Sequence, residues 1–204
     1  MNFLAHLYLS SEEPDALAGS LLPDLVRGPL PADASPVLQA ACRLHRLVDV
    51  FTDTHPLHAR SRERITSVQS RYAGILIDVF YDHFLARDWS RYSSEPLSQY
   101  TARIYQLLLG SRSKLPADMQ YALDMMVQED WLTSYAQVEG IAMILMRMSR
   151  RFSRRFDRPV DLVPAMQDLA AHNEAMGQEF HAFFPQLVTY ACQKEPSVSR
   201  PMHL

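Results

Sequence analysis

Residues 75–89, ILIDVFYDHFLARDW, form an apolar segment that also contains Asp78, Asp82 and His83. Drawn as a helix, the segment is apolar almost all the way around, and such a helix is buried on most of its sides. Asp82 shares its face with apolar side chains: Ile75, Val79, Ala86 and Trp89. Because burial strips a carboxylate of water, Asp82 requires a partner, which could be an arginine or a divalent cation. A structural ion pair or core hydrogen bond is the alternative to a metal site.

Prolines divide the rest of the chain into helical lengths. Glycine is scarce, with 6 in 204 residues, and the alternation typical of strands is hard to find. A proline disfavours α geometry in the residue before it, so the proline-containing breaks mark helix ends. After one or two short N-terminal helices, they predict helices at about 36–53, 55–70, 73–90, 96–112, 116–131, 135–154 and 160–182. We expect an all-α, single-domain helical bundle over residues 1–193, followed by a flexible tail at 194–204.

Composition excludes several classes of protein. The net charge of −3 argues against a general nucleic-acid binder, which needs a basic excess. The two cysteines, Cys42 and Cys192, are too few for a disulfide framework and too far apart for a CxxC metal site. The apolar N-terminus lacks the basic region of a signal peptide, and no apolar run approaches the roughly 18 residues that span a bilayer. We therefore expect a soluble cytoplasmic protein with no membrane or nucleic-acid partner.

A polar stripe runs along the segment RLHRLVDVFTD, residues 43–53. His45, Asp49 and Asp53 recur every four residues, so they span about 80° of the helix surface beside an apolar stripe. The solvated side of a helix explains this pattern, and so does one wall of a metal site. The segment alone does not decide between them.

Two further segments place ionisable side chains in apolar surroundings. In GSLLPDLVRG, residues 19–28, Asp24 follows Pro23, and a kink there would aim the carboxylate inward. Alternatively, Asp24 caps a short helix after the turn. His6 lies in the apolar segment MNFLAHLYLS, where it is either a hydrogen-bonded core residue or a ligand or support of a metal site.

These segments in this order, together with His55 and YDHFLARDW, resemble the acyl carrier protein phosphodiesterase family, also called acyl carrier protein hydrolyases. The resemblance is strong over the first 90 residues. That family in turn resembles an atypical branch of the HD-type metal-dependent phosphohydrolases, all-helical enzymes that gather His and Asp ligands from several helices. Here no adjacent His-Asp pair occurs, and the two neighbours are reversed as Asp82-His83.

The resemblance implies that the chain removes 4′-phosphopantetheine from a serine of holo acyl carrier protein, giving the apo protein and free 4′-phosphopantetheine. It implies a divalent metal, Mn²⁺ in the first place, with Fe²⁺ or Zn²⁺ as alternatives. The expected metal ligands are Asp24, His45, Asp49, Asp82 and His83. Catalytic roles are expected for Asp24, His45, Asp53 and His6, with Asp78 in support. A histidine that does not bind metal would act as the acid toward the serine oxygen.

The segment RMSRRFSRRFDR, residues 147–158, carries the densest charge in the chain. Its arginines recur at three- and four-residue spacing, so several share one face of a helix. This face is either simply solvated or a docking surface for the acidic carrier protein. The expected partner-binding residues are Arg60, Arg64, Arg150, Arg151, Arg154 and Arg155. A phosphohydrolase acting on a nucleotide phosphoester and a non-catalytic helical module that binds an acidic protein are the alternative functions.

Overall fold

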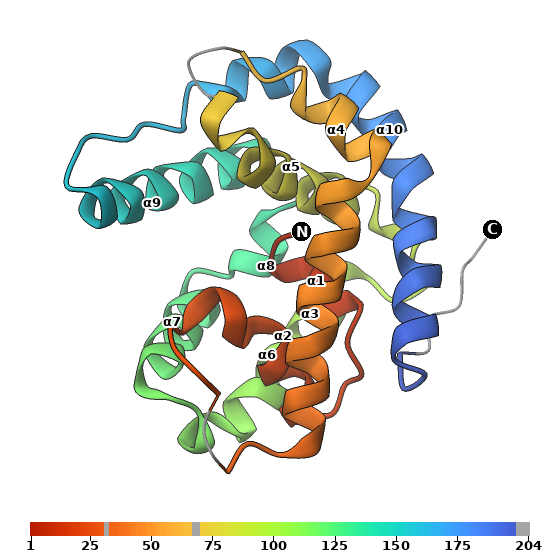
Figure 1. Cartoon of the computed structure of the whole chain (residues 1–204), viewed down its shortest axis with the longest axis vertical. Helices are drawn as coiled ribbons and strands as arrows, with labels where there is room; N and C mark the ends of the chain where they lie inside the picture. Colours follow the sequence, from red (N-terminus) through yellow and green to blue (C-terminus); the bar gives the residue numbers. More distant parts are fainter. Residues whose placement is uncertain (31–32, 67–69, 199–204) are drawn as a thin grey trace.

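The computed structural model describes residues 1–30, 33–66 and 70–198, and the regular structure in these ranges consists of helices without a strand (Figure 1). The α-helices are α1 (Phe3–Tyr8), α2 (Pro14–Leu25), α3 (Pro36–Thr54), α4 (Pro56–Arg62), α5 (Ala73–Arg87), α6 (Leu97–Gly110), α7 (Ala117–Gln128), α8 (Trp131–Ser134), α9 (Val138–Phe156) and α10 (Ala165–Lys194). Short 3₁₀ turns occur at Ser70–Tyr72, Trp89–Arg91 and Arg112–Lys114. The prediction of an all-α bundle is confirmed.

Helix α5 is the buried helix that its apolar sequence predicts. It contacts α1, α4, α9 and α10, and Figure 1 shows it crossing behind α3. Its aromatic side chains Phe80, Tyr81 and Phe84 are fully buried, and Tyr81 and Phe84 pack against Phe180 of α10. Polar side chains on α5 must therefore find their partners inside the protein.

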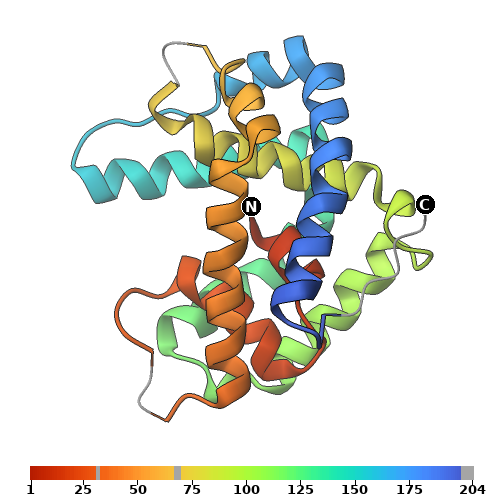
Figure 2. The same ribbon diagram turned by 45° about the vertical axis from the view of Figure 1, so that its right-hand side comes forward.

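Helix α3 is a long helix that joins the two halves of the molecule. In Figure 1 it passes from α2, α6 and α7 in the lower half to α4 and α5 in the upper half. Helix α10 packs along α3 and α4, as Figure 2 also shows. Both views place the N-terminus beside the middle of α3, so residues of α1 and α3 meet in the interior.

Gly19 brings α2 and α3 unusually close together. A Cβ atom at this position would lie 2.5 Å from the carbonyl oxygen of Leu38 and 2.7 Å from the Cβ of Ala41. The helices therefore pack backbone against side chain at a distance that only glycine permits. Cys42 Sγ also donates to the carbonyl oxygen of Gly19 at 3.2 Å. This contact fixes α2 against the part of α3 that precedes His45.

Several helix boundaries differ from the sequence prediction. Helix α4 ends at Arg62, well before residue 70, and 67–69 lie outside the described ranges. Helix α7 ends at Gln128 because Asp130 adopts a left-handed conformation, with φ of 43°, and starts the separate helix α8. Helix α10 continues well past the predicted end at 182, with Pro185 inside it.

Packing explains why Pro185 does not end α10. The residues around it, Phe183, Phe184, Leu187 and Val188, are all buried, so tertiary contacts outweigh the lost backbone hydrogen bond. Helix α10 ends at Lys194, and Val198 is still buried. Residues 199–204 of the predicted tail lie outside the described residues. None of the helices in the described ranges combines the length and apolar character needed to cross a membrane.

Candidate metal centre

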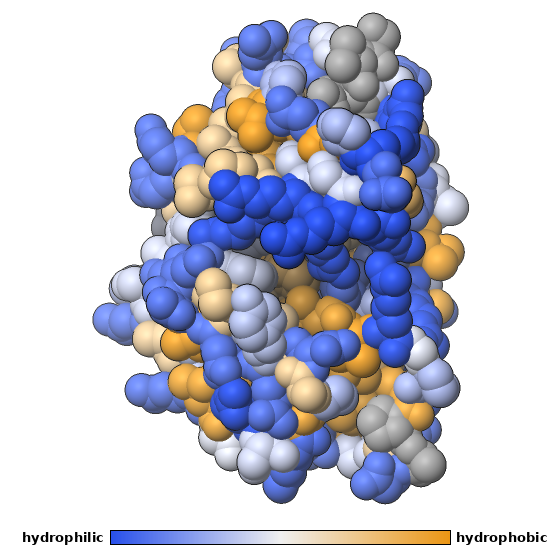
Figure 3. Space-filling model, turned by 90° about the vertical axis from the view of Figure 1, so that its left-hand side faces the viewer, coloured by the Kyte–Doolittle hydropathy of each residue, from blue (hydrophilic) through white to orange (hydrophobic). Residues whose placement is uncertain are grey.

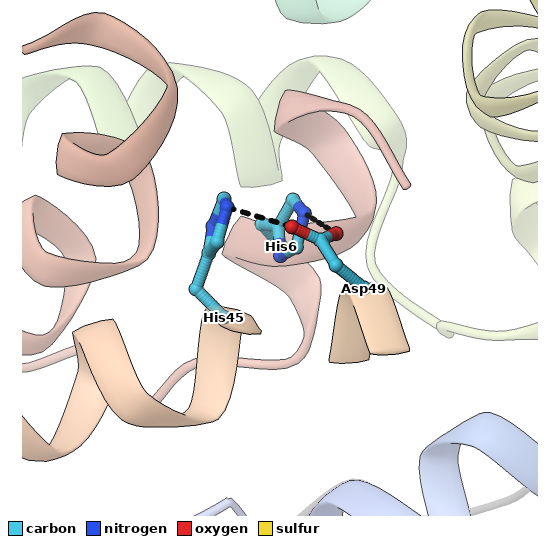
Figure 4. A group of neighbouring side chains, drawn as sticks. All are labelled: His6, His45 and Asp49. Atoms are coloured by element: carbon cyan, nitrogen blue, oxygen red, sulfur yellow. Dashed lines mark ion pairs between the residues drawn. The ribbon is translucent and has the colours of Figure 1, made fainter. Parts of the chain in front are cut away.

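His6 of α1 and His45 and Asp49 of α3 converge on one point (Figure 4). One ligand atom of each lies within 4.8 Å of the others. Asp49 joins the two imidazoles, because its Oδ1 is 3.2 Å from His6 Nε2 and its Oδ2 is 3.1 Å from His45 Nε2. His45 and Asp49 are four residues apart and hence on the same side of α3. This triad is a possible metal site.

The orientation of His45 is fixed by α2. Its Nδ1 lies 2.7 Å from the carbonyl oxygen of Ser20, and a carbonyl only accepts, so Nδ1 carries the proton and donates it. Nε2 is then directed toward Asp49. Metal-binding histidines have this arrangement, in which the second ring nitrogen is held by a carbonyl or carboxylate.

His6 has a polar atom without a hydrogen bond. Its side chain is buried, and its Nε2 is near Asp49 Oδ1 but makes no hydrogen bond of acceptable geometry. Burial, with a smaller effect from His45, lowers the pKa of His6. The ring is therefore neutral near pH 7, which is the form that binds a cation. Its ring stacks on that of His45 with 3.8 Å between centroids.

The charges of His45 and Asp49 depend on each other. Burial opposes the protonation of His45, but Asp24 and Asp49 outweigh it and raise the pKa of His45 to about 9. Burial would also raise the pKa of Asp49, yet the hydrogen bond with His45 holds it well below its usual range. Without a cation, the two form an imidazolium–carboxylate pair. A divalent cation that bound here would displace the proton from His45.

Asp24 stands at the open side of the triad. It lies in the last turn of α2, and its Oδ1 is 3.7 Å from His45 Nε2. The side chains of Asp24 and Asp49 are each 39% exposed, whereas that of His45 is 2% exposed. The site thus has a floor of buried imidazoles and a rim of accessible carboxylates. The alternative in which Asp24 caps the start of a helix is not observed.

Asp82 has backbone partners instead of an arginine. It is fully buried, and its Oδ2 accepts from the backbone N–H groups of Leu4 at 2.7 Å and Ala5 at 3.4 Å, while its Oδ1 accepts from that of Asn2 at 3.3 Å. Burial raises the pKa of Asp82 to about 7. The carboxylate caps the start of α1 and so holds the helix that carries His6.

His83, Asp53 and Asp78 lie outside the triad. Burial lowers the pKa of His83, whose Nδ1 donates to the carbonyl oxygen of Tyr135 at 2.7 Å. Asp53 is exposed one turn beyond Asp49. Like Asp82, His83 and Asp53 therefore have positions that give no support to their predicted roles as ligands or catalytic groups.

Asp78 belongs to a second buried cluster, which adjoins the triad. Its Oδ1 lies 3.1 Å from the α-ammonium nitrogen of Met1 and 3.3 Å from His58 Nε2. The same ammonium nitrogen is 3.5 Å from Asp49 Oδ1. Burial opposes its charge, but Asp78 and Asp49 raise its pKa to about 10. The sequence patterns did not single out His58. The signal for it was Asp78, because a carboxylate on the apolar helix α5 needs a polar partner.

Comparison with known proteins decides the family. The family model described as "Acyl carrier protein phosphodiesterase" matches residues 1–187. The chain belongs to the acyl carrier protein phosphodiesterase family. It is 34% identical over 198 residues to "Acyl carrier protein phosphodiesterase" of Yersinia enterocolitica serotype O:8, covering 96% of this chain and 100% of the relative. It is 33% identical over 195 residues to the protein of that name from Escherichia coli strain K12 / DH10B, covering 95% and 99%. No solved structure matches the chain with statistical significance.

Membership of the acyl carrier protein phosphodiesterase family confirms the resemblance and the prediction of a phosphodiester hydrolase. The relation to HD-type enzymes stays a prediction. All the residues that form the triad and its rim lie within the matched range.

The arginines predicted to bind the partner have different surroundings. Arg64 pairs with Glu179 of α10, with 2.7 Å between Nη2 and Oε1, so it joins the turn after α4 to α10. Arg60 is exposed. The four on α9 are exposed as well: Arg150, Arg151, Arg154 and Arg155. Figure 3 shows a strongly hydrophilic band across the middle of one face, above a hollow with apolar side chains inside it.

Proposed function

We propose that this protein hydrolyses the phosphodiester between 4′-phosphopantetheine and serine in holo acyl carrier protein, in a reaction that depends on a divalent metal. The observation that carries the proposal is the triad, in which buried His6 has no hydrogen bond at Nε2 and Asp49 is open to solvent. The substrate is inferred from the name that the family and its relatives share, acyl carrier protein phosphodiesterase.

The donor set fits a transition metal. His6 Nε2, His45 Nε2 and an oxygen of Asp49 would hold it, and Asp24 lies at the open side of this set, with its Oδ1 3.7 Å from His45 Nε2. Imidazole nitrogens mixed with carboxylates suit Mn²⁺, Fe²⁺ or Zn²⁺ better than Ca²⁺, and we propose Mn²⁺. When bound, such a cation stabilises charge on the non-bridging phosphoryl oxygens and makes a water molecule more acidic.

The surrounding residues orient this site. The carbonyl oxygen of Ser20 holds His45 in one tautomer, and Asp82 holds the start of α1 and with it His6. With both histidines committed to the cation, neither is free to protonate the departing serine oxygen. Asp24 is outside the triad and open to solvent, so we assign to it, or to a water molecule that it holds, the transfer of a proton.

Three exposed arginines of α9 form the proposed docking surface for the carrier. Arg150, Arg154 and Arg155 are exposed on a protein whose net charge is −3. A local basic surface on a slightly acidic enzyme steers an acidic protein toward one face by long-range attraction. Figure 3 views the molecule from the side on which α9 lies in Figure 1, and the hollow below the hydrophilic band is on that face.

A mass measurement tests the proposed function. Holo acyl carrier protein incubated with this protein and Mn²⁺ should lose the mass of one phosphopantetheine, and a chelator should prevent the loss. Asp49→Asn should be inactive, whereas Arg46→Ala, an exposed neighbour on the same helix, should match the wild type. Release of phosphate from a nucleotide with an unchanged carrier would favour the nucleotide phosphohydrolase. Absence of both metal binding and turnover would favour a non-catalytic helical module.

A further inference from the structure

Arg151 is tied to the candidate site, unlike its neighbours on α9. Its Nη2 donates to the main-chain carbonyl oxygen of Asp24 at 3.0 Å. This carbonyl belongs to the last turn of α2, where carbonyl groups have no partner within the helix. The bond therefore ties an exposed guanidinium to Asp24, the residue whose side chain lies beside His45 of the triad.

Other arginines of α9 contact residues outside α2. Arg147 forms an ion pair with Glu129 and lies over the ring of Trp131. Arg155 lies over the ring of Phe156. Among the described residues, Arg151 is the α9 arginine whose side chain forms a hydrogen bond with α2.

The open side of the triad and the guanidinium of Arg151 meet at residue 24. The side chain of Asp24 approaches His45 Nε2 at 3.7 Å, while its main chain receives Arg151. Guanidinium has five N–H groups in a planar fork, and one bond to a carbonyl leaves the others available. A phosphodiester carries one negative charge over two non-bridging oxygens, which matches what an arginine fork binds.

We propose that Arg151 is a catalytic residue that binds a non-bridging phosphoryl oxygen of the substrate, while Arg150, Arg154 and Arg155 serve docking alone. This inference rests on the proposed function, because it places the scissile phosphodiester at the triad. A cation at the triad and Arg151 would then neutralise the phosphoryl group from two sides, and the charge of the transition state would be stabilised in the same way.

The competing explanation is structural. An arginine on the last carbonyls of a helix also stabilises that helix as a C-terminal cap. A cap would contribute to thermal stability and to the position of Asp24. Phosphate binding would then not depend on the guanidinium group itself. The two explanations therefore differ in phosphate binding and in stability.

The experiment compares Arg151→Ala and Arg151→Lys with Arg46→Ala, a matched loss of an exposed arginine next to His45. Inorganic phosphate is titrated into each Mn²⁺-loaded protein by calorimetry. Hydrolysis of holo carrier and of bis(4-nitrophenyl) phosphate, which has no protein surface, is measured in parallel. Melting temperature and Mn²⁺ affinity are recorded for every variant.

We expect Arg151→Ala to weaken phosphate binding and to lower kcat/KM for both diesters by about 10- to 100-fold, with unchanged Mn²⁺ affinity and melting temperature. Arg151→Lys should recover part of the loss, because it keeps the charge without the fork. Arg46→Ala should match the wild type in every assay.

Phosphate binding and small-diester hydrolysis within twofold of the wild type in Arg151→Ala would overturn the assignment. So would a loss of activity accompanied by a loss of Mn²⁺ affinity or of melting temperature, since Arg151 would then act through the fold of α2. The phosphate affinity could depend on Arg151 while the wild-type protein leaves the carrier intact. That result would support the role of Arg151 and refute the proposed carrier substrate.

Discussion

The polar residues of α3 and α5 look alike in sequence and have different uses in the structure. Both helices place carboxylates and histidines beside apolar side chains. On α3, His45 and Asp49 meet His6 at a point that is open to solvent on its carboxylate side. On α5, Asp82 and His83 are closed in, and both bind the backbone of other segments.

This difference distinguishes polar residues that stabilise the fold from polar residues that can bind a ligand. A buried carboxylate whose two oxygens both accept backbone hydrogen bonds has its partners within the fold, so it stabilises the fold. An accessible carboxylate beside an imidazole nitrogen without a hydrogen bond is not filled, and a ligand can complete it. Partner count and exposure separate the two helices, although residue type does not.

The largest expected effect lies on α3. His45→Ala and Asp49→Ala should each lower the rate on holo carrier by at least about 100-fold, because each removes a group of the triad. Arg46→Ala lies between them in sequence but points to solvent, and it should stay within about 0.5 kcal/mol of the wild type in stability with its rate unchanged. Mn²⁺ titration and the mass assay measure these effects. Three equally active variants would show that the stripe on α3 is only a solvated face.

Close packing of α2 on α3 gives the second effect. In Gly19→Ala the new methyl group would meet a backbone oxygen and a Cβ that cannot move aside, which should cost about 3 kcal/mol in the free energy of unfolding. Gly74→Ala, on α5, has no atom within 4 Å of its new Cβ and should be neutral or slightly stabilising. Urea denaturation compares the two variants. Equal stability would mean that α2 shifts without cost and that Ser20 does not depend on this contact to hold His45.

Asp82 gives the third effect and the sharpest test of the comparison. Asp82→Ala leaves the N–H groups of Leu4 and Ala5 buried without an acceptor, which should cost about 2 kcal/mol. The melting temperature should fall by roughly 5 °C, equally with and without Mn²⁺. A fall seen only in the presence of Mn²⁺ would identify Asp82 as a ligand and make α5 part of the metal site.

The sequence was sufficient for the class of fold and for part of the site. Helical periodicity and prolines located most helices, and the four-residue spacing of His45 and Asp49 put them on one face. The partner of Asp82 could not be found in this way, because backbone donors at the start of a distant helix leave no pattern in residue types. Pro185 misled the prediction of α10 for a related reason, since only buried contacts show that a helix continues through a proline.

The smallest effect concerns the docking surface, which lies apart from both helices. Replacing Arg150, Arg154 and Arg155 together by Glu should raise KM for holo carrier about tenfold and weaken its dependence on salt, because exposed charges act through screened attraction. Arg151 is left in place, so hydrolysis of a small diester should stay near the wild-type rate. Steady-state kinetics at several salt concentrations measure both substrates. Normal processing of the carrier would move the docking surface toward Arg60, which is exposed on α4. Equal impairment of both substrates would mean that these arginines support the site itself, and their assignment to docking would be withdrawn.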